Sequence, residues 1–327
     1  MDMSAARGKG TVAIVGGAGA VGSSTAFALM DSGLVGEIVL VDIDDERAEG
    51  EAMDLDHGAY FTSSVRVRTG EYEDCWDADI VVVTAGASQN PGETRLELME
   101  RNAEIFAEMV PEITAGLNDD AVILVVTNPV DVLAYVTWAV SDLPAERVIG
   151  SGTVLDTSRF RHALSREFDL DPANVHAYVI GEHGDSEVLV WSSANLGGVP
   201  FERYCAHRGV EDVDALKSRI GDDVRNAAYE IIERKGRTNY GVARSVTATV
   251  ERILGDDDSI LTVSTLVDGQ HGIEDAYLSL PCTVNRGGVR DVLEFDLSEA
   301  EQTDLEESAA VIRESLDRLD LDELAAD

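Results

Sequence analysis

The fold of this chain is decided by the stretch Thr11-Val12-Ala13-Ile14-Val15-Gly16-Gly17-Ala18-Gly19-Ala20-Val21-Gly22. Its first five residues predict a buried strand, and the small residues after the glycines predict a helix. Gly17, Gly19 and Gly22 fit the pattern G-x-G-x-x-G, and Gly16, Gly19 and Gly22 fit G-x-x-G-x-x-G equally well. Glycine lets a backbone approach a pyrophosphate at a helix N-terminus. We therefore expect Gly17, Gly19, Val21 and Gly22 to contact a dinucleotide.

An acidic residue at the end of the next predicted strand supports this interpretation. Asp42 closes the run 37–42 and follows Gly22 by 20 residues. A carboxylate there accepts hydrogen bonds from the ribose hydroxyls of adenosine and repels a 2′-phosphate, which favours NAD over NADP. The alternative is an ordinary tight turn followed by a surface aspartate.

The remaining pattern predicts an α/β protein with two domains. Short apolar runs such as 80–84 and 121–126 alternate with helical patterns such as 45–58 and 95–117. This alternation predicts a Rossmann-type, doubly wound parallel sheet within a dinucleotide-binding domain, residues 1–155. Residues 156–327 are expected to form a mixed α+β substrate domain. Its predicted helices are 156–168, 213–234, 242–254 and one from Ser298, and its predicted antiparallel strands are 260–267, 276–280 and 289–295.

Charge is the unusual feature of the composition. The chain of 327 residues has 63 acidic and 25 basic residues, a formal net charge of −38, spread over its whole length. A hydrophobic content of 44% and persistent apolar periodicity argue against disorder. We therefore expect a folded protein with a solvated acidic surface, as in an extreme halophile. Such a surface repels phosphates, so nucleic acid is not an expected partner.

Cysteine usage and hydropathy narrow the setting. Cys75, Cys205 and Cys282 are far apart and odd in number, which predicts neither a disulfide framework nor a zinc site, and no metal is expected. No apolar stretch is long enough to predict a membrane span, and the N-terminal residues do not resemble a secretory signal. We expect a cytoplasmic protein.

A histidine in the motif Gly181-Glu182-His183-Gly184-Asp185 is the first candidate for chemistry. It follows the apolar run 177–180, a predicted strand, and strand ends in α/β proteins commonly carry catalytic groups. A lone histidine in such a turn is more often structural, so the interpretation depends on partners. Asp156 could orient the imidazole and stabilise its protonated form. Arg159, three residues further on a predicted helix, could bind a carboxylate in bidentate fashion.

Four motifs in order now resemble the lactate/malate dehydrogenase family. They are residues 84–95, 127–131, 155–159 and 181–185, and the resemblance runs from about Thr11 to about Leu319. It implies oxidation of a 2-hydroxy acid with NAD. His183 would be the proton acceptor and donor, which suits an imidazole whose unperturbed pKa is about 6.5. Arg95 would stabilise charge on the substrate oxygen.

The resemblance also assigns contacts with the substrate and the cofactor. Residues 87–95 would form a lid, and Asn128, before a cis peptide to Pro129, would touch both substrate and nicotinamide. The other cofactor contacts that it implies are Gly86, Ala87, Thr127, Ser151 and Val242.

The choice of acid is predicted from Gln89. Malate enzymes of the family carry an arginine there, which pairs with the second carboxylate of their substrate, whereas lactate enzymes carry a glutamine. With Gln89, oxaloacetate would bury an unpaired carboxylate, at a cost of several kcal/mol. Thr238 also matches a substrate-pocket threonine of lactate enzymes. Lactate and pyruvate are therefore favoured, and malate or a broader range of 2-hydroxy acids is the alternative.

Two further expectations follow from the same family. Arg161 and His176 match the arginine and histidine that bind fructose 1,6-bisphosphate between subunits in some lactate enzymes, although each also suits an ordinary helix or strand. The family implies a homotetramer. A non-catalytic binding module on the same fold is the alternative from another class, and the intact set of His183, Asp156, Arg159 and Arg95 argues against it.

Overall fold

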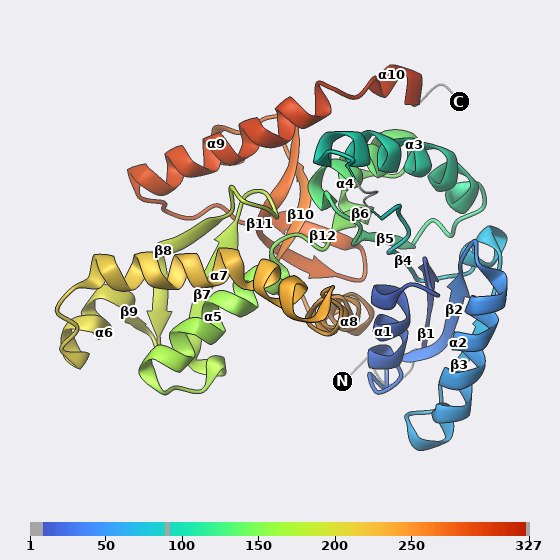
Figure 1. The fold of residues 1–327 in the computed structure, drawn as a ribbon, viewed down its shortest axis with the longest axis horizontal. Helices are drawn as coiled ribbons and strands as arrows, with labels where there is room; N and C mark the ends of the chain where they lie inside the picture. The colour runs from blue at the N-terminus through green and yellow to red at the C-terminus, as the bar shows by residue number, and fades with distance from the viewer. Residues whose placement is uncertain (1–8, 89–91, 325–327) are drawn as a thin grey trace.

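A nine-stranded sheet forms the backbone of the computed structural model, which describes residues 9–88 and 92–324 (Figure 1). Its strand order is β12-β11-β10-β6-β5-β4-β1-β2-β3. The six strands from β6 to β3 are parallel to one another, in the order of a doubly wound dinucleotide-binding fold. They are β1 (Gly10–Val15), β2 (Val35–Val41), β3 (Arg66–Thr69), β4 (Ile80–Val83), β5 (Val122–Val125) and β6 (Val148–Gly150). The predicted Rossmann-type architecture is confirmed.

Helices cover both faces of the parallel part because alternate strand residues point to opposite sides. Val12 and Ile14 of β1 pack in one core with α1 (Ala20–Leu29), α2 (Asp45–Gly58) and α8 (Tyr240–Gly255). Ala13 and Val15 pack in another core with α3 (Arg95–Thr114) and α4 (Val130–Ser141). The strands are thus buried on both sides, which explains why they are continuous apolar runs.

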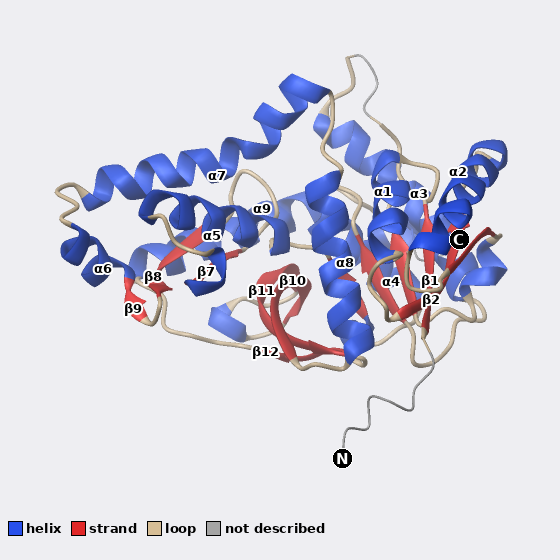
Figure 2. Ribbon diagram, turned by 90° about the horizontal axis from the view of Figure 1, so that it is seen from below, coloured by secondary structure: helices blue, strands red, loops and turns tan. Residues whose placement is uncertain are grey.

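The antiparallel strands that the sequence predicted extend this same sheet. They are β10 (Ser259–Val267), β11 (Ala276–Asn285) and β12 (Gly288–Val292), and β10 joins β6 where Ser264 pairs with Gly150. A Cβ atom at Gly150 would meet the Cβ of Ser264 at 2.8 Å, so the close approach of β6 and β10 at this point requires a glycine. Both views place these strands between the parallel sheet and the smaller lobe (Figures 1 and 2).

The smaller lobe has a core of its own, formed by α5, α6, α7, β7 and β8. The bounds of its elements are α5 (Val154–Phe168), β7 (Val175–Ile180), β8 (Val188–Leu196), β9 (Val199–Pro200), α6 (Phe201–Arg208) and α7 (Val213–Lys235). Helix α9 (Glu299–Leu316) packs on β8 and β11 and begins with the predicted capping box of Ser298 and Glu301. The chain described ends in α10 (Leu321–Leu324), and short 3-10 helices lie at Ala59–Phe61, Tyr72–Cys75, Ala145–Arg147, Pro172–Asn174 and Gln270–Gly272.

Candidate active site

The glycine loop between β1 and α1 is built for close approach by a ligand. Gly16 has φ +83°, and a Cβ atom there would meet the backbone N of Ala85 at 2.5 Å. Gly19 is the N-cap of α1 and has no side chain to cover the free N–H groups of the first turn. These features leave an uncovered helix N-terminus beside the carboxyl end of β1, which fits a pyrophosphate.

Asp42 lies beside this loop, as the sequence predicts. Its Oδ2 accepts a hydrogen bond from the backbone N–H of Ala18 at 2.9 Å, and its Oδ1 accepts one from Asp44 at 3.1 Å. The carboxylate is therefore fixed at the end of β2 with lone pairs left for ribose hydroxyls.

The side of the candidate cofactor site that faces the glycine loop is formed by the segments that follow β4 and β5. The hydroxyl of Thr127 donates to the carbonyl of Ala85 at 2.6 Å, and a Cβ at Gly86 would meet the Cγ2 of Thr127 at 2.5 Å. The peptide between Asn128 and Pro129 is cis, as the resemblance implied. The backbone N–H of Ser151, after β6, donates to Val125 at 2.7 Å. The predicted cofactor contacts thus gather at the carboxyl edge of the sheet.

Asn102 supports this side of the site, and the sequence analysis missed it. It is 1% exposed on α3; its Oδ1 accepts from the backbone N–H of Ala87 at 2.8 Å, and its Nδ2 donates to the carbonyl of Asn128 at 3.5 Å. One amide therefore holds two segments that were predicted separately.

His183, Asp156 and Arg159 form a continuous chain of polar contacts. Nδ1 of His183 lies 2.6 Å from Oδ2 of Asp156, and Nη1 of Arg159 donates to Oδ1 of Asp156 at 2.6 Å. The Asp156 side chain is only 3% exposed, whereas those of Arg159 and His183 are 17% and 25% exposed. Each outer group can therefore meet a ligand while the aspartate behind them stays dry.

The burial and charges of this chain set its protonation. Burial acts to lower the pKa of His183, but the charge and hydrogen bond of Asp156 outweigh it and raise the pKa to about 9. Burial acts to raise the pKa of Asp156, yet His183 and Arg159 hold it below its ordinary value. The pair is thus an imidazolium beside a carboxylate at neutral pH.

Arg95 lies apart from this chain of contacts. It is the first residue of α3, its Nη1 is 3.2 Å from Oδ2 of Asp185, and its Nη2 donates to the hydroxyl of Tyr229 at 3.0 Å. Tyr229 in turn donates to Asp185 at 2.6 Å, and the Arg95 side chain is 75% exposed. The structure thus joins Arg95 to the His183 loop through Asp185, two residues beyond the histidine, and not to the imidazole.

Two buried acids near His183 were not predicted. Asp131 accepts a hydrogen bond from the backbone N–H of His183 at 2.7 Å and is 2% exposed. Glu187 is 5% exposed, and burial raises its pKa to about 8. Both act electrostatically on His183. Asp131 ends the motif 127–131 and Glu187 lies two residues beyond the motif 181–185, but only the fold shows that both carboxylates act on His183.

The other residues predicted to contact the substrate or the nicotinamide are Gln89, Thr238 and Val242. Gln89 lies outside the described residues. Thr238 is in the turn between α7 and α8, and Val242 is in the first turn of α8 and packs against the α1 core. The side-chain amide of Asn239 donates to Ser24 of α1 at 2.9 Å, which ties this turn to the dinucleotide-binding part.

Arg161 and His176 occupy neighbouring elements, α5 and β7. The Nε of Arg161 donates to the carbonyl of Ala177 at 2.9 Å, and its guanidinium carbon lies 5.4 Å from the ring centre of Tyr178. His176, the residue before Ala177, is exposed. The two side chains therefore come from adjoining backbone, and Arg161 is already engaged.

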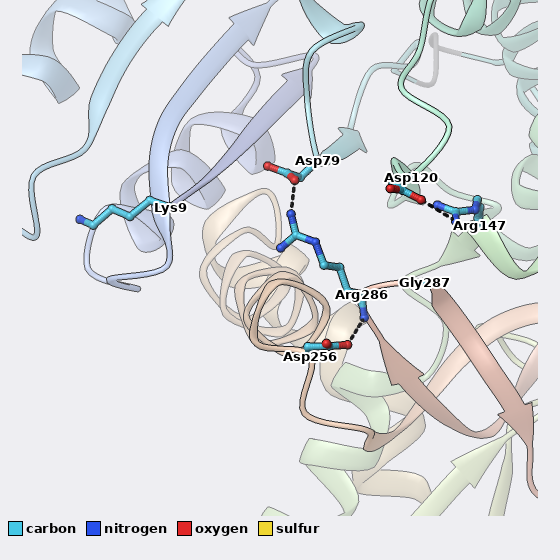
Figure 3. A pocket seen from close by; sticks show the side chains of 7 residues that line it. All are labelled: Lys9, Asp79, Asp120, Arg147, Asp256, Arg286 and Gly287. Atoms are coloured by element: carbon cyan, nitrogen blue, oxygen red, sulfur yellow. Dashed lines mark hydrogen bonds and ion pairs between the residues drawn. The ribbon is translucent and has the colours of Figure 1, made fainter. Parts of the chain in front are cut away.

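A cavity of about 590 Å³ lies at the opposite, amino edge of the sheet (Figure 3). Apart from Lys9, its lining charges pair with one another: Arg286 with Asp79, Arg147 with Asp120 at 3.3 Å, and the backbone N–H of Arg286 with Asp256. The two contacts of Arg286 join the β11–β12 turn to the start of β4 and to the end of α8, and the Arg147 pair joins the start of β5 to that of β6. They are a structural contact and lie away from the predicted chemistry.

Within residues 9–88 and 92–324, no group of three or more His, Cys, Asp or Glu is arranged to hold a metal ion. No helix in the same part of the chain is long and apolar enough to cross a membrane.

Comparison with known proteins defines the class. Residues 10–150 match the lactate/malate dehydrogenase NAD binding domain, and residues 153–320 match the lactate/malate dehydrogenase alpha/beta C-terminal domain. The chain belongs to the lactate/malate dehydrogenase family, and its cofactor is NAD.

Particular relatives cover nearly the whole chain. L-lactate dehydrogenase 1 of Clostridium acetobutylicum is 52% identical, over 95% of this chain and 99% of its own. L-lactate dehydrogenase of Bacillus velezensis is 52% identical, over 93% and 96% respectively. The crystal structure of the minor L-lactate dehydrogenase from Enterococcus mundtii in its ligands-bound form superposes with a TM-score of 0.91, at 42% identity over 95% of this chain and 98% of that one.

Proposed function

We propose that this chain is an L-lactate dehydrogenase that interconverts pyruvate and L-lactate with NAD. The observation that carries the proposal is the contact chain from His183 through Asp156 to Arg159. It places a protonated imidazole and a guanidinium on the two oxygens of one buried carboxylate. A 2-oxo acid has two matching groups, a ketone that needs a proton and a carboxylate that needs a cation.

The chain's own residues then divide the work. Arg159 uses one nitrogen on Asp156 and keeps other N–H groups for the substrate carboxylate. His183 gives its proton to the ketone oxygen during reduction and takes it back from the hydroxyl during oxidation. Asp156 stabilises the imidazolium and fixes which ring nitrogen faces the substrate. Arg95 would stabilise the charge on that oxygen once it leaves Asp185 and Tyr229.

The cofactor site fits NAD on the geometry of the glycine loop. When bound, NADH supplies the hydride. The N-terminus of α1 would hold the pyrophosphate, Asp42 the ribose, and residues 84–87 with Thr127 and Asn128 the facing side. The close approach of Gly16 to Ala85 supports this assignment, since a side chain would fill the cradle.

Pyruvate is the proposed substrate because Gln89 has no charge for a second carboxylate. Steady-state kcat/KM with NADH tests this directly: the value for pyruvate should exceed that for oxaloacetate. The variant Gln89→Arg should shift the preference toward oxaloacetate. A wild-type enzyme that prefers oxaloacetate would make the chain a malate dehydrogenase and overturn the proposal.

A homotetramer is the proposed assembly. Large apolar side chains lie exposed on the neighbouring helices α1 and α2 and just after them: Phe27 is 67% exposed, Met53 54%, Tyr60 88% and Phe61 83%. Exposed apolar groups of this size mark interaction surfaces. Light scattering in molar KCl should give about four times the 35.1 kDa chain mass; a monomer would refute the proposed assembly.

The effector, the setting and the salt requirement complete the proposal. Fructose 1,6-bisphosphate at Arg161 and His176 should lower KM for pyruvate, and no response at either low or high salt would remove that part. We place the enzyme in the cytoplasm, where it would act on the pyruvate of glycolysis. The three cysteines are free and buried, which suits a reducing compartment. A net charge of −38 supports a halophilic protein.

A further inference from the structure

Asp131 joins the two halves of the candidate active site. It lies in the first turn of α4, two residues after the cis peptide at Pro129 and three after Asn128. Its Oδ2 accepts the backbone N–H of His183 at 2.7 Å, a contact across 52 residues of sequence. The turn that presents Asn128 therefore also holds the main chain of His183.

The burial of this carboxylate is costly. Asp131 is 2% exposed, and its Oδ1 has no hydrogen-bond partner among the residues that the structure describes. Burial raises its pKa to about 6, although the Ser264 hydroxyl and the N–H of His183 act against the rise. Ser264 lies close, since a Cβ at Gly150 would touch both Ser264 and Val130, but no hydrogen bond of ordinary geometry joins its hydroxyl to Oδ1.

An apolar residue would suit this position better if stability alone mattered. The neighbours Val130, Val132 and Leu133 are buried in apolar cores, and a buried charge with one oxygen unpaired is destabilising. Among the described residues, the hydrogen bond that Asp131 accepts comes from the backbone N–H of His183, the proposed proton donor. The geometry therefore indicates a role in placing His183.

We propose that Asp131 is a positioning residue, which fixes the His183 main chain relative to Asn128 so that the imidazole meets both Asp156 and the substrate. The proposal rests on the proposed function of His183 as proton donor. Asp131 touches no ring atom of His183 in any hydrogen bond of the described residues, so a neutral acceptor of the same shape should serve almost as well.

Charge must be separated from position in the test. The carboxylates that act on His183 are Asp156 of α5, Asp131 of α4 and Glu187 just before β8, and Glu182 acts on Asp131. Asp131→Asn keeps an oxygen acceptor for the His183 N–H and removes one charge. Asp131→Ala removes both. Thr137→Ala, on the same helix, removes another fully buried polar group, which bonds only to Leu133, and serves as the matched control.

The kinetic experiment measures kcat and KM for pyruvate with NADH as a function of pH. We expect Asp131→Ala to lower kcat on the order of a hundredfold, because a displacement of about 1 Å has that effect. KM should change much less, since Arg159 is untouched. Asp131→Asn should recover kcat to within about fivefold of wild type, while the break in its pH profile moves lower because one negative charge near His183 is gone. Thr137→Ala should keep kcat.

Several outcomes would overturn the assignment. Wild-type kcat in Asp131→Ala would do so, and so would an Asp131→Asn variant as impaired as the alanine variant, since charge would then explain the loss. Histidine labelled with 15N gives a second readout that does not need activity. The His183 amide proton, assigned with His183→Asn, should move upfield in Asp131→Ala and stay in Asp131→Asn; an unmoved signal in the alanine variant contradicts the contact. A wild type inactive on pyruvate would remove the proposed function alone, because the amide signal still tests the contact.

Discussion

The charge of Asp156 accounts for the unusual basicity of His183, and Asp156→Asn tests this in isolation. The substitution keeps the shape and a hydrogen-bonding group but removes the charge. The pKa of His183 rises from 6.5 to about 9, which corresponds to about 3 kcal/mol in favour of the imidazolium. Asp156 supplies the largest part of the rise, while burial acts in the opposite direction. Without that charge the pKa should return to 6.5 or lower.

The assay is the pH dependence of kcat/KM for pyruvate, which reports the free enzyme. Reduction requires the protonated imidazole, so the wild-type value should stay level below about pH 9 and fall above it. In Asp156→Asn the fall should begin near pH 6.5. At pH 8 only about one imidazole in thirty would then be protonated, a loss of about thirtyfold from protonation alone.

A control and a second parameter make the result decisive. Asp120→Asn changes an 87% exposed carboxylate at the far edge of the sheet and should leave the profile unchanged. Asp156→Asn also deprives Arg159 of its charged partner, so KM is measured separately at about pH 5, where His183 is largely protonated in both enzymes. A break that stays near pH 9 in Asp156→Asn would refute the account of His183.

Three further predictions concern the arginine that binds the substrate carboxylate, a buried acid near His183 and the negative charge of the surface. Arg159→Lys should lower kcat/KM for pyruvate about tenfold to a hundredfold, since lysine cannot bind a carboxylate in bidentate fashion; an unchanged value contradicts the role. Burial raises the pKa of Glu187 from 4.5 to about 8, so its stability cost is absent below pH 4.5 and grows up to pH 8. Glu187→Gln should therefore raise the melting temperature at pH 8 by about 2–5 °C and leave it unchanged at pH 4; a lower value at pH 8 would contradict this. The wild type, with a net charge of −38, should melt higher in molar KCl, where the Debye length is about 3 Å, than in dilute buffer; equal melting points would refute the halophilic interpretation.

The parallel sheet was predictable because its signals are local. The first strand, the glycine loop and Asp42 lie within about forty residues, and each later apolar strand is recognisable from its own short run of residues. Helix α4 was missed for a physical reason: eight of its twelve residues are buried, so it has no polar face to reveal a helical period.

The site residues that lie within sequence motifs were predictable. His183, Asp156 and Arg159 stand in recognisable stretches, and the structure brings them together. Asn102 and Tyr229 reach the site from other helices, α3 and α7. Asp131 and Glu187 lie in or beside the motifs, but an acid such as Asp131 in a first helical turn is ordinarily explained by the helix dipole alone. Their positions follow from packing between distant segments, which a single sequence does not encode locally.

The pairing of Ser264 with Gly150 limits how far the two family domains are independent modules. A fragment that stopped at residue 150 would lose β10 as the neighbour of β6 and would lose α8, whose Val246 and Val250 share a core with Val12. It would display an unpaired strand edge beside an uncovered apolar face, which is the arrangement that invites aggregation. Exchange of cofactor domains between relatives must therefore carry α8 and β10 with them, although both lie a hundred residues further along the chain.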